Sequence, residues 1–147
     1  MRIAFGTDET TDVTVAIQAH LTAAGHQVAV VADPADWPDA GRAVGEEVAA
    51  GRAEAGVVCC WTGTGVTMAA NKVAGVRAAL CGDGETARGA RRWNDANVLA
   101  VSLRLTSAPV ARELLDAFLA TPADPAEAAQ VAKLAAPPGR AGTGRRA

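Results

Sequence analysis

The segment 55–72 (AGVVCCWTGTGVTMAANK) joins an apolar run, a glycine-containing turn and a stretch of helix formers. The apolar run, which ends at Cys60, predicts a short buried strand. Gly63 and Gly65 allow backbone N–H groups of the turn to face inward, and the helix adds partial positive charge at its N-terminus. Open α/β sheets build anion and oxyanion sites from a strand, a glycine loop and a helix in this order, so Cys60 would lie beside any ligand held there.

Other apolar runs alternate with helical patterns in the same way. Strands are predicted at 2–6, 26–32, 57–60, 76–81 and 97–102, with helices after 9 and at 39–50, 66–73, 85–93, 107–120 and 125–135. The run at 28–31 shows no polar alternation, which favours a parallel sheet covered on both faces. The pattern predicts an α/β fold, a Rossmann-like doubly wound three-layer sandwich with a five-stranded parallel sheet.

Length and composition limit the classes of protein that this chain can be. Its 147 residues suit one domain, which we place at 1–136, followed by a disordered tail at 137–147 that is rich in Gly, Arg and Pro. A net charge of −2 provides no basic field for nucleic acid, and no apolar run is long enough to span a membrane. The N-terminus lacks a signal-peptide pattern and the three cysteines form no disulfide framework, so we expect a cytoplasmic protein.

Ligands of doubly wound sheets bind at the carboxyl ends of the strands. This rule places four polar residues at one edge, namely Asp8, Cys60, Asp83 and Arg104. Asp8 has two interpretations, contact with a ligand or capping of the first helix, and its place at a strand end favours the first. Gly63 and Gly65 with Asp83 also resemble part of a dinucleotide fingerprint, but the loop follows the third strand and lacks the third glycine, which disfavours nucleotide binding.

A set of motifs occurs in order over about residues 1–120. They are Gly6-Thr7-Asp8, Cys60-Trp61-Thr62-Gly63-Thr64-Gly65, Ala69-Ala70-Asn71-Lys72, Gly75-Val76-Arg77-Ala78-Ala79-Leu80-Cys81, Thr86-Ala87-Arg88 and Asn94-Asp95-Ala96-Asn97-Val98-Leu99-Ala100. Together they resemble the family of type B ribose-5-phosphate isomerases and galactose-6-phosphate isomerases. The resemblance implies a homodimer, or a tetramer, with active sites shared between subunits, and aldose–ketose isomerisation through an enediolate without a metal or cofactor.

The resemblance also implies catalytic roles for the segment around the third strand end. Cys60 falls on the general base that moves a proton between C1 and C2 of the sugar. Thr62, with the backbone amides of Gly63, Thr64 and Gly65, falls on the group that stabilises the enediolate oxygen. The chemistry is coherent, because the positive end of a helix stabilises a thiolate and preorganised donors stabilise a developing oxyanion.

Substrate contacts are implied on other loops, with two departures from the family. Asp8 falls on a residue that contacts the sugar and helps to open its ring, Asn94 on a sugar contact, and Arg104 on an arginine that helps to hold phosphate. Glu9 stands where the family has a histidine after Asp8, and Trp93 stands where the family has a histidine before Asn94. The second histidine assists ring opening, which an indole cannot do by proton transfer.

Two more departures concern phosphate binding and the mouth of the pocket. The family carries a Gly-Gly-Arg-His stretch and further arginines near its C-terminus, whereas residues 122–130 contain no cation. Glu9 would oppose an anionic ligand, and Trp61 adds bulk where the family has a small residue. We therefore expect a diverged substrate that is unphosphorylated, carries a carboxylate or is already open-chain, with a pronounced loss of activity on ribose 5-phosphate. Two alternatives are a different proton transfer next to a carbonyl, such as epimerisation or tautomerisation, and a catalytically degenerate binding protein.

Overall fold

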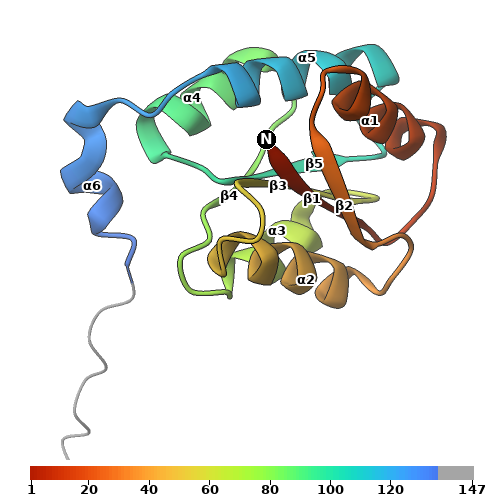
Figure 1. The fold of residues 1–147 in the computed structure, drawn as a ribbon, viewed down its shortest axis with the longest axis horizontal. Helices are drawn as coiled ribbons and strands as arrows, with labels where there is room; N and C mark the ends of the chain where they lie inside the picture. The colour runs from red at the N-terminus through yellow and green to blue at the C-terminus, as the bar shows by residue number, and fades with distance from the viewer. Residues whose placement is uncertain (136–147) are drawn as a thin grey trace, which may run out of the picture.

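A computed structural model describes residues 1–135 and has three layers, with helices on both faces of a central sheet (Figure 1). The α/β doubly wound architecture predicted from the sequence is confirmed. The disordered tail predicted at 137–147, and the domain boundary placed before it, lie outside the described residues. Within the described part of the chain, no helix combines the length and the hydropathy that crossing a bilayer requires.

The strands are all parallel and follow the order β2-β1-β3-β5-β4 across the five-stranded sheet. Their bounds are β1 Arg2–Thr7, β2 Gln27–Ala32, β3 Ala55–Cys60, β4 Ala78–Leu80 and β5 Val98–Ser102. The fourth strand is shorter than the predicted span 76–81. The difference arises because Val76 belongs to a turn, in which its N–H donates to the Val73 carbonyl at 3.1 Å.

The helices divide between the two faces of the sheet (Figure 1). One face is covered by α1 Asp12–Ala23, α4 Gly84–Asn94 and α5 Ala108–Ala120, and the other by α2 Trp37–Ala49 and α3 Thr64–Asn71. The predicted last helix at 125–135 is instead a 3₁₀ turn, Pro125–Glu127, followed by α6, Ala128–Ala132. Because α1 follows β1 on one face and α3 follows β3 on the other, the chain changes faces between these two adjacent strands. Such a switch point opens a crevice at the carboxyl ends of the strands.

The second strand is an exception to the predicted burial. The unbroken apolar run at 28–31 predicts cover on both faces, but three of the six residues of β2 are exposed and only one is buried, and Val30 is 49% exposed. The reason is position, because β2 is an outermost strand that pairs with β1 alone. By contrast, β3 lies in the middle of the sheet and is buried along its whole length.

Candidate active site

The carboxyl ends of β1 and β3 meet at the switch point and bring Asp8 next to the cysteine pair. The Asp8 N–H donates to the Cys59 carbonyl at 3.2 Å, which continues the parallel ladder one residue beyond β1. Cys60 is the last residue of β3. Asp8 and Cys60 therefore lie at the same edge of the sheet, on neighbouring strands.

The two adjacent cysteines point to opposite faces of the sheet, as alternation along a strand requires. Cys59 packs in the core beneath α1 and α5, where burial raises the pKa of its thiol far above the ordinary value. Cys60 packs on the α2–α3 side and is 5% exposed at the strand end. Of the two thiols, Cys60 is therefore the one on the side of α2 and α3 and at the strand end, and Cys59 is a residue of the core on the opposite face.

The loop that follows Cys60 depends on one glycine. Gly63 has φ +78°, and a Cβ there would lie 2.4 Å from Leu80 Cδ1 and 3.0 Å from the Ser102 backbone nitrogen. Glycine alone meets both conditions, because the left-handed region disfavours side chains and backbone cannot move aside. The loop thus packs against the end of β5 and leads directly into the N-terminus of α3.

Hydroxyl groups line the same loop. Thr62 and Thr64 are exposed, and their side-chain oxygens form a hydrogen bond of 2.8 Å. Thr67, one turn into α3, donates its hydroxyl to the Gly63 carbonyl at 2.6 Å and so orients that peptide. Gly65 lies beneath the ring of Trp37, whose Cε3 atom would be 2.9 Å from a Cβ at that position. The loop is thereby fixed on both sides and presents hydroxyls at the start of a helix.

Asp8 is not the cap of α1. Thr11 has that role, since its hydroxyl accepts from the Thr14 N–H at 3.3 Å in a capping box. The Asp8 Oδ1 atom is buried and has no hydrogen-bond partner among the described residues. Burial raises the pKa of the Asp8 carboxyl, and the neighbouring charge of Glu9 raises it further. A partly desolvated carboxylate with one unpartnered oxygen at a strand end is available to a substrate.

Replacing Asp8 by asparagine should increase stability at neutral pH. Because the folded state raises the pKa of Asp8, its ionised form disfavours folding once the pH passes through the unfolded value. We expect the melting temperature of Asp8→Asn to exceed that of the wild type by about 2 °C at pH 7, with the difference vanishing near pH 3. Asp83→Asn is the matched control, and its melting temperature at pH 7 should fall below that of the wild type, because hydrogen bonds from Thr86 lower the pKa of Asp83. Equal melting temperatures at pH 7 would contradict the expectation for Asp8.

The loop after β5 is hydrogen-bonded to the segment that follows Cys60. The Arg104 N–H donates to the Trp61 carbonyl at 2.8 Å, and the Ser102 hydroxyl donates to the same oxygen at 3.1 Å. The side chains of Arg104 and Trp61 are exposed beside this junction. Ser102 is the residue that the sequence analysis missed, and its place as the last residue of β5, level with Cys60, could have indicated it.

Trp93 and Asn94 lie at the other end of the sheet. They end α4, which starts after the carboxyl end of β4, and the next loop reaches the start of β3, where the Gly56 N–H donates to the Asn97 carbonyl at 2.9 Å. The length of a strand, about 3.3 Å per residue, separates them from Cys60. One chain therefore brings together Asp8, Glu9, the 60–65 loop and Arg104, but not Trp93 or Asn94.

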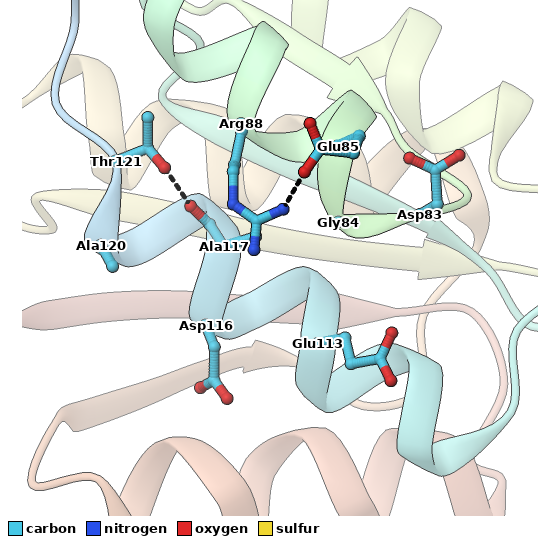
Figure 2. Close-up of a pocket in the computed structure, with 9 residues that line it drawn as sticks. All are labelled: Asp83, Gly84, Glu85, Arg88, Glu113, Asp116, Ala117, Ala120 and Thr121. Carbon is cyan, nitrogen blue, oxygen red and sulfur yellow. Dashed lines mark hydrogen bonds and ion pairs between the residues drawn. The ribbon is translucent and has the colours of Figure 1, made fainter.

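A second region is a cavity of about 610 Å³ between α4 and α5, whose lining does not include Cys60 (Figure 2). Arg88 forms an ion pair with Glu85 at its rim, and Glu113 and Asp116 lie on the opposite side. Asp83, which the sequence analysis placed at the ligand edge, lines this cavity. Its carboxylate caps α4 by accepting a hydrogen bond from the Thr86 N–H at 2.7 Å. Among residues 1–135, no group of three His, Cys, Asp or Glu side chains could hold a metal ion.

Comparisons with known proteins agree on one family. The model of the family described as Ribose/Galactose Isomerase matches residues 3–134. Ribose-5-phosphate isomerase B of Escherichia coli is 36% identical over 123 residues, which cover 80% of this chain and 83% of that protein. The galactose-6-phosphate isomerase subunit LacB of Clostridium acetobutylicum is 46% identical over 83 residues, covering 56% of this chain and about half, 48%, of that protein.

Solved structures show the same similarity along almost the whole chain. Ribose-5-phosphate isomerase B of Clostridium thermocellum has a TM-score of 0.87 at 34% identity, covering 91% of this chain and 95% of its own. The type B ribose 5-phosphate isomerase of Trypanosoma cruzi has a TM-score of 0.81 at 36% identity, with the same two coverages of 91% and 95%.

Proposed function

The chain belongs to the ribose/galactose isomerase family, and on this premise we propose that it interconverts an aldose and a ketose through an enediolate. The observation that carries the proposal is the place of Cys60, at the carboxyl end of β3 beside Asp8 and before the glycine loop of α3. In the proposed reaction the Cys60 thiolate removes the proton from C2 of the aldose and returns it to C1. The C2–H and O2–H bonds break while a C1–H and an O1–H bond form, so the substrate has no net gain or loss of hydrogen or electrons and the reaction needs no redox cofactor.

The glycine loop has the chemistry that an enediolate requires. Removal of a proton next to a carbonyl places negative charge on the carbonyl oxygen, which donors held in place in advance stabilise. The hydroxyls of Thr62 and Thr64 and the N–H groups at the start of α3 are such donors, and Gly63 fixes their geometry. Asp8 is proposed to bind the sugar and to assist ring opening, and Arg104 to bind an oxygen-rich part of the substrate.

Solvent-deuterium exchange tests the proposed proton transfer. The protein is incubated in heavy water with sugar phosphates, free sugars and sugar acids, and NMR monitors the hydrogens next to each carbonyl. We expect deuterium to enter C1 or C2 of at least one sugar together with aldose–ketose conversion, and neither event with Cys60→Ala. Exchange without conversion would indicate an epimerase or tautomerase, and no exchange dependent on Cys60 with any compound would contradict the proposal.

We further propose a homodimer in which each site uses residues of both chains. The support is the separation within one chain, because Trp93 and Asn94 lie a full strand length from Cys60. Trp93 is 56% exposed at the amino-terminal edge, where its ring lies over Gly89 and its outer face is accessible to a second chain. In such a dimer, Trp93 of the partner subunit and Asn94 of the partner subunit would complete the site formed by Cys60 and Asp8.

Mixing two inactive variants tests this sharing. Cys60→Ala and Asn94→Ala are each expected to be inactive as homodimers, whereas a mixture that is unfolded and refolded together should recover about a quarter of the wild-type activity. The recovery arises because half of the random dimers are mixed, and each of these contains one intact site. Recovery that stays at the level of the separate variants would contradict a shared site, and light scattering on the same samples checks the oligomeric state.

A further inference from the structure

The loops at the carboxyl edge of the sheet are strongly acidic. These are the loops that follow the five strands, at 8–11, 33–36, 61–63, 81–83 and 103–107. Within residues 1–135 they carry Asp8, Glu9, Asp33, Asp36 and Asp83 as acids and Arg104 as the cation. None of these acids has an ion-pair partner in that part of the chain. Within one chain, the described loops of this edge therefore carry four more acidic than cationic side chains, five against one.

Two of these acids lie directly at the proposed reaction centre. Asp8 continues the ladder beside Cys59, and its buried Oδ1 accepts no hydrogen bond from the described residues. Glu9 is exposed next to it, in a turn closed by the Thr7 hydroxyl, which donates to the Glu9 carbonyl at 2.8 Å. Glu9 already opposes the ionisation of Asp8. Carboxylates of this kind are acceptors, so they suit hydroxyl donors and repel a phosphate.

Indole surfaces accompany the acids. Trp61 follows Cys60 directly and is 54% exposed, while its backbone carbonyl is held by Ser102 and Arg104. Trp37 is 47% exposed and covers Gly65 at the start of α3. These are large apolar surfaces on a backbone that hydrogen bonds hold in place. An indole face suits the C–H face of a sugar, as it suits other flat apolar groups.

We propose that the substrate of this site is an unphosphorylated sugar, whose hydroxyls donate to Asp8 and Glu9 and whose C–H face packs on Trp61. The inference rests on the proposed function, because it assigns a substrate class to the site at which Cys60 acts. The relatives named above are isomerases of phosphorylated sugars, so the inference distinguishes this chain within its family. It also accounts for Glu9, which would disfavour a phosphate and favours a hydroxyl.

Competition between matched sugars tests the inference. The ratio of kcat/KM for D-ribose to kcat/KM for D-ribose 5-phosphate, and the same ratio for other free and phosphorylated aldose pairs, is measured for the wild type, Glu9→Gln and Trp61→Gly. We expect at least one free sugar to exceed its phosphorylated partner in the wild type. Glu9→Gln should shift the ratio toward the phosphorylated sugar by about tenfold or more, because it removes a like charge near the dianion. Trp61→Gly should raise KM for the free sugar.

Glu113→Gln is the control for Glu9→Gln. It removes an equal charge on α5 in the cavity of Figure 2 and should leave the ratio unchanged.

The outcomes separate the inference from the proposed function. A higher kcat/KM for every phosphorylated sugar, abolished by Cys60→Ala, would overturn the inference and leave the isomerase intact. A ratio that does not respond to Glu9→Gln would overturn the role of Glu9 and with it the inference. Absence of any reaction that depends on Cys60 would overturn both. A preference for a free sugar that Glu9→Gln reverses and Glu113→Gln does not is the supporting result.

Discussion

Replacing Cys60 by alanine is expected to lower kcat for isomerisation by about a thousandfold or more, with little change in KM. The reason is the role proposed for the thiolate, since a positioned base contributes about 10² to 10⁴ to the rate of proton transfer. Cys60 belongs to a packed cluster with Val58 and Val66, so the fold should persist when one small side chain replaces another. Steady-state kinetics and thermal melting of the same samples measure both quantities.

Cys59→Ala is the matched control. It removes the same atoms one residue earlier in β3, on the opposite face of the sheet, where the thiol is fully buried in the core beneath α1 and α5. We expect this variant to lose some stability and to keep kcat within about twofold of the wild type. If Cys60→Ala lost no more activity than Cys59→Ala, the base would have to be another residue.

Replacing Gly63 by alanine is expected to destabilise the protein by about 3 kcal/mol or more and to abolish activity. Two costs combine, because alanine is strained at φ +78° and its Cβ would lie 2.4 Å from Leu80 Cδ1 and 3.1 Å from the Val101 carbonyl carbon. The Leu80 side chain can rotate away, but the backbone of Val101 and Ser102 cannot, so either the loop or the end of β5 must move. Such a shift would displace Thr62 and the N-terminus of α3, so loss of the oxyanion site should accompany loss of stability.

Gly75→Ala separates the two costs. Gly75 has φ +86°, close to the value at Gly63, but a Cβ there would have no heavy atom within 4 Å. We expect this variant to lose about 1 kcal/mol, the cost of backbone strain alone, and to keep its activity. Urea denaturation of both variants gives the difference between their free energies of unfolding. Equal losses of stability would show that the atoms around position 63 move aside at little cost.

The local features of the fold could be predicted because local chemistry determines them. Alternating apolar runs and helical patterns place each strand and most helices, and Thr11 and Ser107 cap the helices that they precede. The exposure of β2 could not be predicted in this way. A run of Val and Ala is compatible with both an edge and a centre strand, and long-range pairing decides between the two.

The candidate site was predictable where it follows directly from strand ends. Asp8, Cys60 and Arg104 could be placed together because parallel strands end at one edge. The same rule separates Trp93 and Asn94 from them, because α4 connects two parallel strands and must end at the opposite edge of the sheet. The bond from Ser102 to the Trp61 carbonyl could not be predicted, since a single serine at a strand end carries no distinguishing pattern.

The strand order also bears on how the chain folds during synthesis. β5 lies between β3 and β4, so the last strand to leave the ribosome is an inner one. Until residues 98–102 emerge, β3 has β1 as its neighbour and β4 has no strand to pair with. A nascent chain that is still shorter therefore exposes one edge of β3, a strand without a charged side chain to discourage pairing with another molecule. Arrival of β5 covers that edge and, through the bonds from Leu103 to Cys60 and from Arg104 to Trp61, completes the crevice in the same late event.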